Sequence, residues 1–172
     1  MKRIILSLLL LLAPTAAFAQ NYPITTSVSA APTCDTSAYA TGDLIGGKLT
    51  YTQALRKGTG YIVGVIVTDL SAQASDLEVV VFNANPSNTT FTDQAAFDVG
   101  DADISKIAGS VLLGSSNRFA YADNGVKTSF SPPIPIVSAT GDGTFYAALI
   151  SRGTPTFAAS TDVKVIFLLS QD

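Results

Sequence analysis

The stretch that decides the fold is Tyr61-Ile62-Val63-Gly64-Val65-Ile66-Val67, which reads YIVGVIV over residues 61–67. β-Branched and aromatic residues fit a pleated surface, so this run predicts a β-strand. Gly58-Thr59-Gly60 precedes the run and Asp69 follows it, and both are turn signals. The sequence therefore predicts a strand that begins and ends within about ten residues.

Both faces of this predicted strand are apolar. Because strand side chains alternate, one face takes Ile62, Gly64 and Ile66, and the other takes Tyr61, Val63, Val65 and Val67. The runs at 145–150 and 163–169 are also largely apolar on both sides. A sheet with water on its outer side alternates apolar and polar residues. We therefore expect the outer side to be covered, either by the chain's own long loops or by a neighbouring subunit, which makes a homo-oligomer a reasonable hypothesis.

Other short β-like runs extend outward from this strand in both directions. They lie at 48–52, 77–82, 111–113, 119–121, 134–137, 145–150 and 163–169. The run at 134–137 contains a proline, which cannot donate a backbone hydrogen bond and so suits an edge. Helix is plausible only near 92–97 and 103–108. The pattern predicts an all-β protein: a single antiparallel β-sandwich, jelly-roll-like, with one or two short helical turns.

The chain divides into three predicted parts. Residues 1–19 combine a basic start, an apolar run and Ala17-Phe18-Ala19, which is typical of a secretory signal peptide. That apolar run is shorter than a membrane span, and no later segment is long enough to be one. Residues 20–42 are rich in Ala, Thr, Ser and Pro and predict a flexible or extended arm. Residues 43–172 form the predicted sandwich domain, and the protein is expected to be exported to the periplasm or the extracellular space.

The charge and the single cysteine limit the partners. Loss of Lys2 and Arg3 with the signal leaves 8 basic residues of the original 10 against 13 acidic ones, a net charge of −5. A mildly acidic surface argues against nucleic-acid binding and against adsorption to anionic lipid. Cys34 is the only cysteine, so no disulfide forms within the chain. We expect its thiol to lie in the arm or to be lightly buried, and pairing between chains is the alternative.

The residue types that are missing exclude several functions. The chain has no histidine, so neither a Ser-His-Asp nor a Cys-His catalytic arrangement can be built. One cysteine without histidine also cannot make a zinc or blue-copper site. No phosphate-binding glycine motif is present, and Glu78 is the only glutamate, with no obvious carboxylate partner. The sequence thus predicts no enzyme and no cofactor.

Three aspartates, Asp98, Asp101 and Asp103, fall within six residues and are the candidate metal ligands. Calcium binds six to eight oxygen atoms, but this spacing does not match an EF-hand loop and no closing glutamate follows. The alternative is a short helix, in which Asp101 or Asp103 is the N-cap and Gly109 ends the helix. We prefer capping and keep calcium as the alternative.

The order of motifs resembles a known group of proteins. The relevant segments are 35–50, 58–63, 67–73, 81–87, 97–107, 149–156 and 162–165, including Val81-Phe82-Asn83-Ala84-Asn85-Pro86-Ser87 and Ser151-Arg152-Gly153-Thr154-Pro155. The chain is similar in pattern, over roughly residues 35–172, to small all-β structural proteins of tailed bacteriophages, of the capsid-decoration or minor-virion type. The resemblance implies a non-enzymatic subunit that binds other virion proteins and itself. The predicted signal peptide departs from that group, because virion proteins assemble in the cytoplasm.

Two functions follow as expectations. The first is an exported structural or interaction protein that binds protein partners and self-associates. The alternative is an extracellular or periplasmic binding module of β-sandwich type, which recognises carbohydrate or a surface partner through loops such as 83–93, 114–118 and 152–161 at one end of the sandwich.

Overall fold

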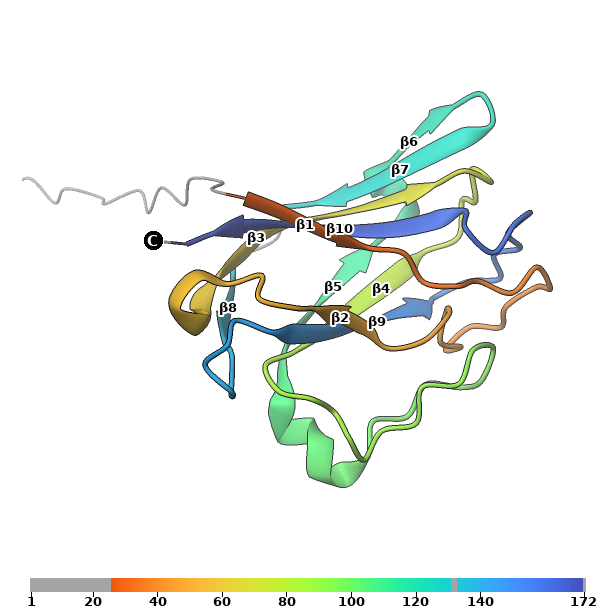
Figure 1. The fold of residues 1–172 in the computed structure, drawn as a ribbon. Coiled ribbons are helices and arrows are strands. Elements are labelled where there is room, and N and C mark those ends of the chain that lie inside the picture. The colour runs from red at the N-terminus through yellow and green to blue at the C-terminus, as the bar shows by residue number, and fades with distance from the viewer. Residues whose placement is uncertain (1–25, 131–132, 172) are drawn as a thin grey trace, which may run out of the picture.

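The computed structural model describes residues 26–130 and 133–171, and the predicted signal peptide lies outside these ranges (Figure 1). Ten strands are present in this part of the chain: β1 (Thr26–Ala30), β2 (Leu49–Tyr51), β3 (Thr59–Asp69), β4 (Leu77–Phe82), β5 (Ile107–Leu113), β6 (Arg118–Tyr121), β7 (Asn124–Ser129), β8 (Ile134–Val137), β9 (Phe145–Ser151) and β10 (Val163–Ser170). Three short 3-10 helices accompany them: η1 (Arg56–Gly58), η2 (Asp101–Lys106) and η3 (Ser115–Asn117). None of the described helices has the length and apolar character needed to cross a membrane.

The strands form two antiparallel sheets that pack face to face (Figure 1). The six-stranded sheet has the order β1-β10-β3-β7-β6, and β8 also pairs with β3. The four-stranded sheet has the order β2-β9-β4-β5. The predicted all-β antiparallel sandwich is confirmed.

Strands pair from the outside of the chain inward. β1 pairs with β10, β2 with β9, β3 with β8, and β4 with β5. The β6–β7 hairpin is inserted into this scheme and pairs with the Val65–Asp69 part of β3, on the far side of β3 from β10. β1 to β4 therefore alternate between the two sheets, and the β1–β10 pairing brings the two ends of the described chain together.

The core lies between the sheets and contains large apolar side chains from both. Tyr51 stacks on Phe145 with ring centroids 4.8 Å apart, and Phe167 meets both rings edge-on. Val65 and Val67 of β3 are fully buried in the same cluster. The decisive run of the sequence thus supplies the centre of the sandwich.

The predicted division of β3 into two faces is wrong at its start. β10 pairs Leu168 with Gly64 but Leu169 with Ile62, so Val63 is an extra residue on β3. Such a bulge shifts the alternation by one residue. Ile62 therefore joins Val65 in the core, while Gly64 lies on the outer face.

The described part of the predicted flexible or extended arm, residues 26–42, belongs to the sandwich. β1 is a strand of the six-stranded sheet and lies beside β10. Tyr39 is 1% exposed and packs edge-on against Phe157 of the core. The segment lacks the bulky periodic pattern of a strand because β1 is an edge strand, whose outward side chains Ser27 and Ser29 face solvent.

Two local features also differ from the sequence pattern. Residues 92–97 contain a turn, closed by the Ala95 N–H and the Thr92 carbonyl, and no helix. Asn124-Gly125, a pair typical of hairpin turns, here begins β7, since the turn of that hairpin is Ala122-Asp123. Sequence reasoning missed β7 because Lys127 and Ser129 point into the sandwich, which breaks the expected apolar alternation.

Candidate functional site

The three aspartates of the candidate metal loop do not come together. Asp98 and Asp101 are exposed, whereas Asp103 is fully buried. In the described ranges, no three or more His, Cys, Asp or Glu side chains are grouped so that they could hold a metal ion. The residue at the N-cap of η2 is Gly100, and no side chain caps this helix, so the predicted capping role of Asp101 or Asp103 is also wrong.

Asp103 instead ties down a loop. Its carboxylate accepts hydrogen bonds from the Asn88 N–H at 2.7 Å, the Thr89 hydroxyl at 2.8 Å and the Lys106 ammonium at 2.7 Å. Burial acts to raise the pKa of Asp103, but these hydrogen bonds outweigh it and hold the pKa well below its ordinary value. Asp103 in η2 thus links two parts of one loop, and its carboxylate oxygens accept from the chain's own donors.

That loop covers the outer face of the four-stranded sheet. We call residues 83–106 the covering loop; they run beneath this sheet in Figure 1. Phe91, Phe97 and Val99 of the loop pack on a second apolar cluster of the sheet's outer face, formed by Leu44, Val80, Phe82, Ala148 and Ile150. We call this outer face of the four-stranded sheet, with its five cluster residues, the covered face. One part of the sequence expectation, an outer face covered by the chain's own loop, therefore holds for this sheet.

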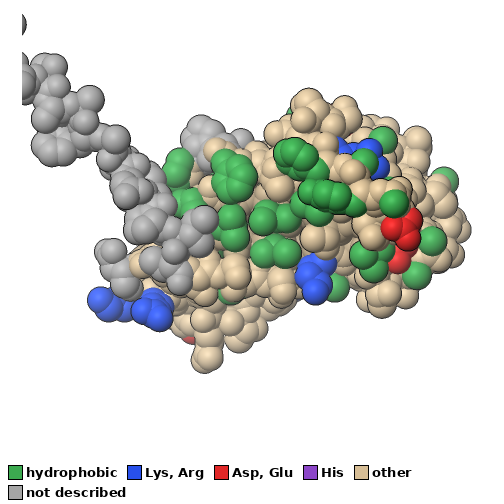
Figure 2. All heavy atoms as spheres, turned by 90° about the horizontal axis from the view of Figure 1, so that it is seen from above, with side chains coloured by type: hydrophobic (Ala, Val, Ile, Leu, Met, Phe, Trp, Pro, Cys, Tyr) green, Lys and Arg blue, Asp and Glu red, His purple; other side chains and the backbone are tan. Residues whose placement is uncertain are grey.

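The outer face of the six-stranded sheet has no such cover among the described residues. Its outward side chains in β3, β6, β7 and β10 are mostly apolar, and we call them, with Phe130, the open face: Ile66, Phe119, Tyr121, Val126, Phe130, Ile166 and Leu168. Three of these rings are largely exposed: Phe119 at 58%, Tyr121 at 60% and Phe130 at 66%. Figure 2 looks onto this side and shows the hydrophobic side chains gathered in one patch, with charged side chains around it. Large exposed apolar patches of this kind mark interaction surfaces.

A cluster of buried charges lies at the end of β3. Asp69 and Lys127 are 3% and 2% exposed, and burial raises the pKa of the first and lowers the pKa of the second. Asp69 accepts the N–H groups of Ser71 and Gln73, while Lys127 donates to the Gln73 carbonyl at 2.6 Å. These groups hold the turn after β3 through its backbone. The Ser71 hydroxyl likewise donates to Asp162, whose carboxylate also accepts backbone N–H groups of its own loop.

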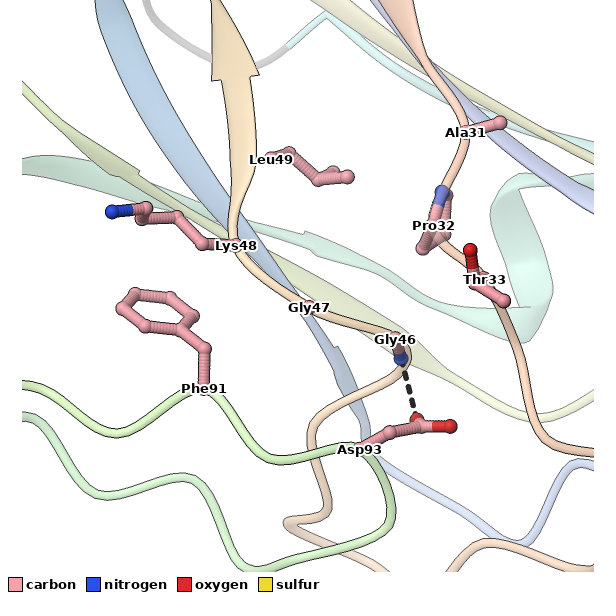
Figure 3. A pocket seen from close by; sticks show the side chains of 9 residues that line it. All are labelled: Ala31, Pro32, Thr33, Gly46, Gly47, Lys48, Leu49, Phe91 and Asp93. Carbon is pink, nitrogen blue, oxygen red and sulfur yellow. Dashed lines mark hydrogen bonds between the residues drawn. The ribbon is translucent and has the colours of Figure 1, made fainter.

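One open hollow, of about 510 Å³, lies beside β2 (Figure 3). Its lining includes Gly46, Lys48, Phe91 and Asp93. Asp93 accepts the Gly46 N–H at 2.6 Å and the Tyr39 hydroxyl at 2.8 Å. Lys48 donates to Asn85 and stands over the Phe91 ring at 5.9 Å. Asp93 and Lys48 are thus each bonded to other groups of the chain, and these bonds tie the covering loop to residues 39–48.

The loops predicted for a binding module do not share one end of the sandwich. Residues 114–118 and 152–161 meet at Asp76, which accepts the N–H of Ser115 through its side chain and the N–H of Arg152 through its carbonyl. Residues 83–93 belong to the covering loop and leave the opposite end of β4. Glu78, for which the sequence showed no carboxylate partner, forms an ion pair with Arg152 at 2.5 Å.

Cys34 is buried in the core at 3% exposure. Burial, the largest cause, raises the pKa of its thiol to about 12. A thiol in this position remains protonated and packs as a small apolar side chain.

Comparison with protein-family models, curated proteins and solved structures finds no match for this chain.

Proposed function

We propose that this chain is a non-enzymatic exported structural subunit that docks to protein through the open face. The observation that carries the proposal is the contrast in cover: the covered face is sealed by the chain's own loop, whereas the open face presents three largely exposed aromatic rings. A monomer surface leaves few contiguous apolar patches of this extent without a partner. Docking another protein on the open face removes that surface from water.

The strand order supports a virion-type subunit. Pairing of the first strand with the last, and so on inward, is the winding of a jelly roll, if the β6–β7 hairpin is counted as an insertion. Jelly rolls recur in viral capsid and lectin domains. We therefore extend the proposal to a jelly-roll subunit of the capsid-decoration type, in line with the sequence resemblance to tailed-phage proteins. Fold likeness of this kind is an analogy and gains force only with the open face.

The polar side chains of the described chain support a role without chemistry. The buried carboxylates Asp69, Asp103 and Asp162 each accept backbone N–H groups of nearby loops. Lys127, the one buried lysine of the described residues, is bonded to a backbone carbonyl. A general acid or base needs a proton-accepting or proton-donating atom directed at a substrate. These groups are instead directed at the chain itself.

Cysteine accessibility in place tests the docking proposal. Cysteine is introduced as Thr128→Cys on the outer side of β7 or as Leu112→Cys on β5, whose side chain is 59% exposed. The full chain is labelled with a polar maleimide, both purified at high dilution and in the cells or particles that carry it. We expect Thr128→Cys to be protected in place and labelled when dilute, and Leu112→Cys to be labelled in both. Equal labelling of Thr128→Cys in both settings would contradict the proposal.

A further inference from the structure

We infer that the partner on the open face is a second copy of this chain, packed about a two-fold axis that runs parallel to β3. This inference rests on the proposed docking function and adds the identity and orientation of the partner. In such a dimer the same surface faces itself, so every contact must be self-complementary. The register of the six-stranded sheet allows that condition to be examined residue by residue.

The apolar rows match under this symmetry. An axis along β3 places β10 of one copy over β7 of the other and β3 over β3. Ile166, Ile66 and Thr128 share one row of the sheet, so Ile66 meets Ile66 of the second copy and Ile166 meets Thr128. In the neighbouring row, Leu168 pairs with Gly64, over which the Phe130 ring lies. The symmetry therefore sets Leu168 of each copy against Phe130 of the other, an aliphatic side chain on an exposed ring.

The glycine at this row shapes the contact. A Cβ on Gly64 would stand 2.9 Å from the Phe130 ring, so the missing side chain lets that ring lie down on the sheet. A ring lying flat keeps the open face level, and two such faces can approach as sheets do in a sandwich, about 10 Å apart.

The charges also complement one another. No charged side chain points outward from β3 or β7, so nothing of like charge meets at the axis. Lys164 on β10 shares a row with Thr68 of β3 and Val126 of β7, and is exposed. The two-fold axis carries Lys164 over Val126 of the second copy. Asp123 lies three residues from Val126 at the hairpin turn, about 10 Å along a strand, so Lys164 of one copy and Asp123 of the other are opposite charges at the same margin of the interface. Each dimer gains two such pairs.

The charges at the margins of the open face fit a like partner. The face carries Lys164 as a positive group at one margin and Asp123 as a negative group at the β6–β7 turn. A basic partner would be repelled by Lys164, and a strongly acidic one by Asp123. A second copy presents both signs in the matching places, which favours it over a partner of a single sign.

Site-directed cross-linking tests the arrangement. In a Cys34→Ala background, Ile66→Cys places a thiol next to the axis, and Ser29→Cys places one on the same face but two strands away, on β1. Two copies of residue 29 then lie four strand spacings apart, about 19 Å. We expect a short bismaleimide to convert the purified full-length Ile66→Cys chain to a covalent dimer, and to leave Ser29→Cys and Leu112→Cys monomeric. Thermal melts establish that each variant is folded.

A charge exchange gives a second measurement. We expect Lys164→Glu to weaken dimerisation about two- to fivefold, as exposed pairs do, and the double change Lys164→Glu with Asp123→Lys to restore it in sedimentation. No covalent dimer from Ile66→Cys, or equal cross-linking from Ser29→Cys, overturns the two-fold arrangement. Failure of the double variant to recover overturns the Lys164–Asp123 contact.

The two proposals fail differently. Protection of Thr128→Cys in place without an Ile66→Cys dimer means that another protein covers the open face, which overturns the second copy and keeps the docking function. Absence of both protection and dimer overturns both.

Discussion

The outer faces of the two sheets begin from the same kind of sequence and end differently. β4 and β9 of the four-stranded sheet, like β3 and β10 of the six-stranded sheet, carry apolar residues on both sides. On the covered face, the covering loop lays three apolar side chains over the strands. On the open face, the described chain provides only Phe130, which lies on Gly64 and is itself exposed.

The contrast shows that the apolar residues of an outer face do not by themselves determine whether a loop of the same chain covers it. A loop can serve only where something fixes it in place, because ordering a loop costs conformational entropy. Asp103 fixes the covering loop through a buried carboxylate with several donors. No comparable buried anion stands on the open face among the described residues. The chain's own loop therefore covers one sheet, and the described residues provide no such cover for the other.

The largest expected effect is a difference in stability between substitutions on the covered face and on the open face. Phe82 is fully buried under the covering loop. The substitution Phe82→Ala should lower the free energy of unfolding by about 3–5 kcal/mol, because a cavity remains. The matched change on the open face, Phe130→Ala, should cost less than about 1 kcal/mol, since that ring is exposed. Urea unfolding of dilute protein measures both. Similar losses for the two variants would erase the distinction between the faces.

Removal of the Asp103 carboxylate, which holds the covering loop, should have the second-largest effect on stability. Asp103→Ala leaves the Asn88 N–H, the Thr89 hydroxyl and the Lys106 ammonium without their acceptor. We expect the melting temperature to fall by about 5–8 °C. Hydrogen exchange should accelerate in 83–106 and not in β3 or β7. Uniform acceleration over the whole chain would show that Asp103 supports the fold in general and not the covering loop.

Backbone clearance distinguishes the faces more finely. A Cβ on Gly100 would stand 2.4 Å from the Asn88 carbonyl oxygen, a backbone atom of the covering loop. We expect Gly100→Ala to cost about 1–3 kcal/mol. Gly64→Ala meets only the side chains of Phe130 and Leu168, which can move, and should cost less than about 1 kcal/mol in dilute solution. Thermal melts of the two variants compare them directly, and an equal cost would mean that these two side chains cannot move aside.

Acid should give the smallest effect. The pKa of Asp103 is lower in the folded chain than its ordinary 3.8, so its stabilisation is present above pH 3.8 and is lost as pH falls through the folded-state value. The difference in melting temperature between the wild-type chain and Asp103→Asn should therefore shrink between about pH 6 and about pH 2. A difference that stays constant over this range would show that the carboxylate charge does not hold the loop.

Much of the fold was predictable from local pattern. The strands at 77–82 and 134–137 were predicted to the residue, and those at 145–151 and 163–170 within one residue. Such strands have dense β-branched or aromatic runs between clear turn signals. The polar strands β1 and β7 were missed, because β1 is a serine-rich edge and β7 sends Lys127 into the sandwich. In both, pairing with a neighbour and not local preference makes the strand.

The candidate site was less predictable. The three aspartates were noticed for their spacing, yet the distances to Asn88 and Thr89 decide what Asp103 does. Those partners lie 14 and 15 residues away in sequence, and no local rule joins them. The open face was anticipated only as one of two possible outcomes for an apolar outer surface.

By itself the sequence determined the fold class, the position of most strands and the lack of histidine chemistry, since each follows from residue type and alternation over a few neighbours. Only the tertiary structure decided which of two apolar faces is covered, that residues 26–42 join the sheet and the core, and that Asp103 secures a loop. Those outcomes depend on which distant segments meet, and contact across the sandwich is not encoded in any short stretch.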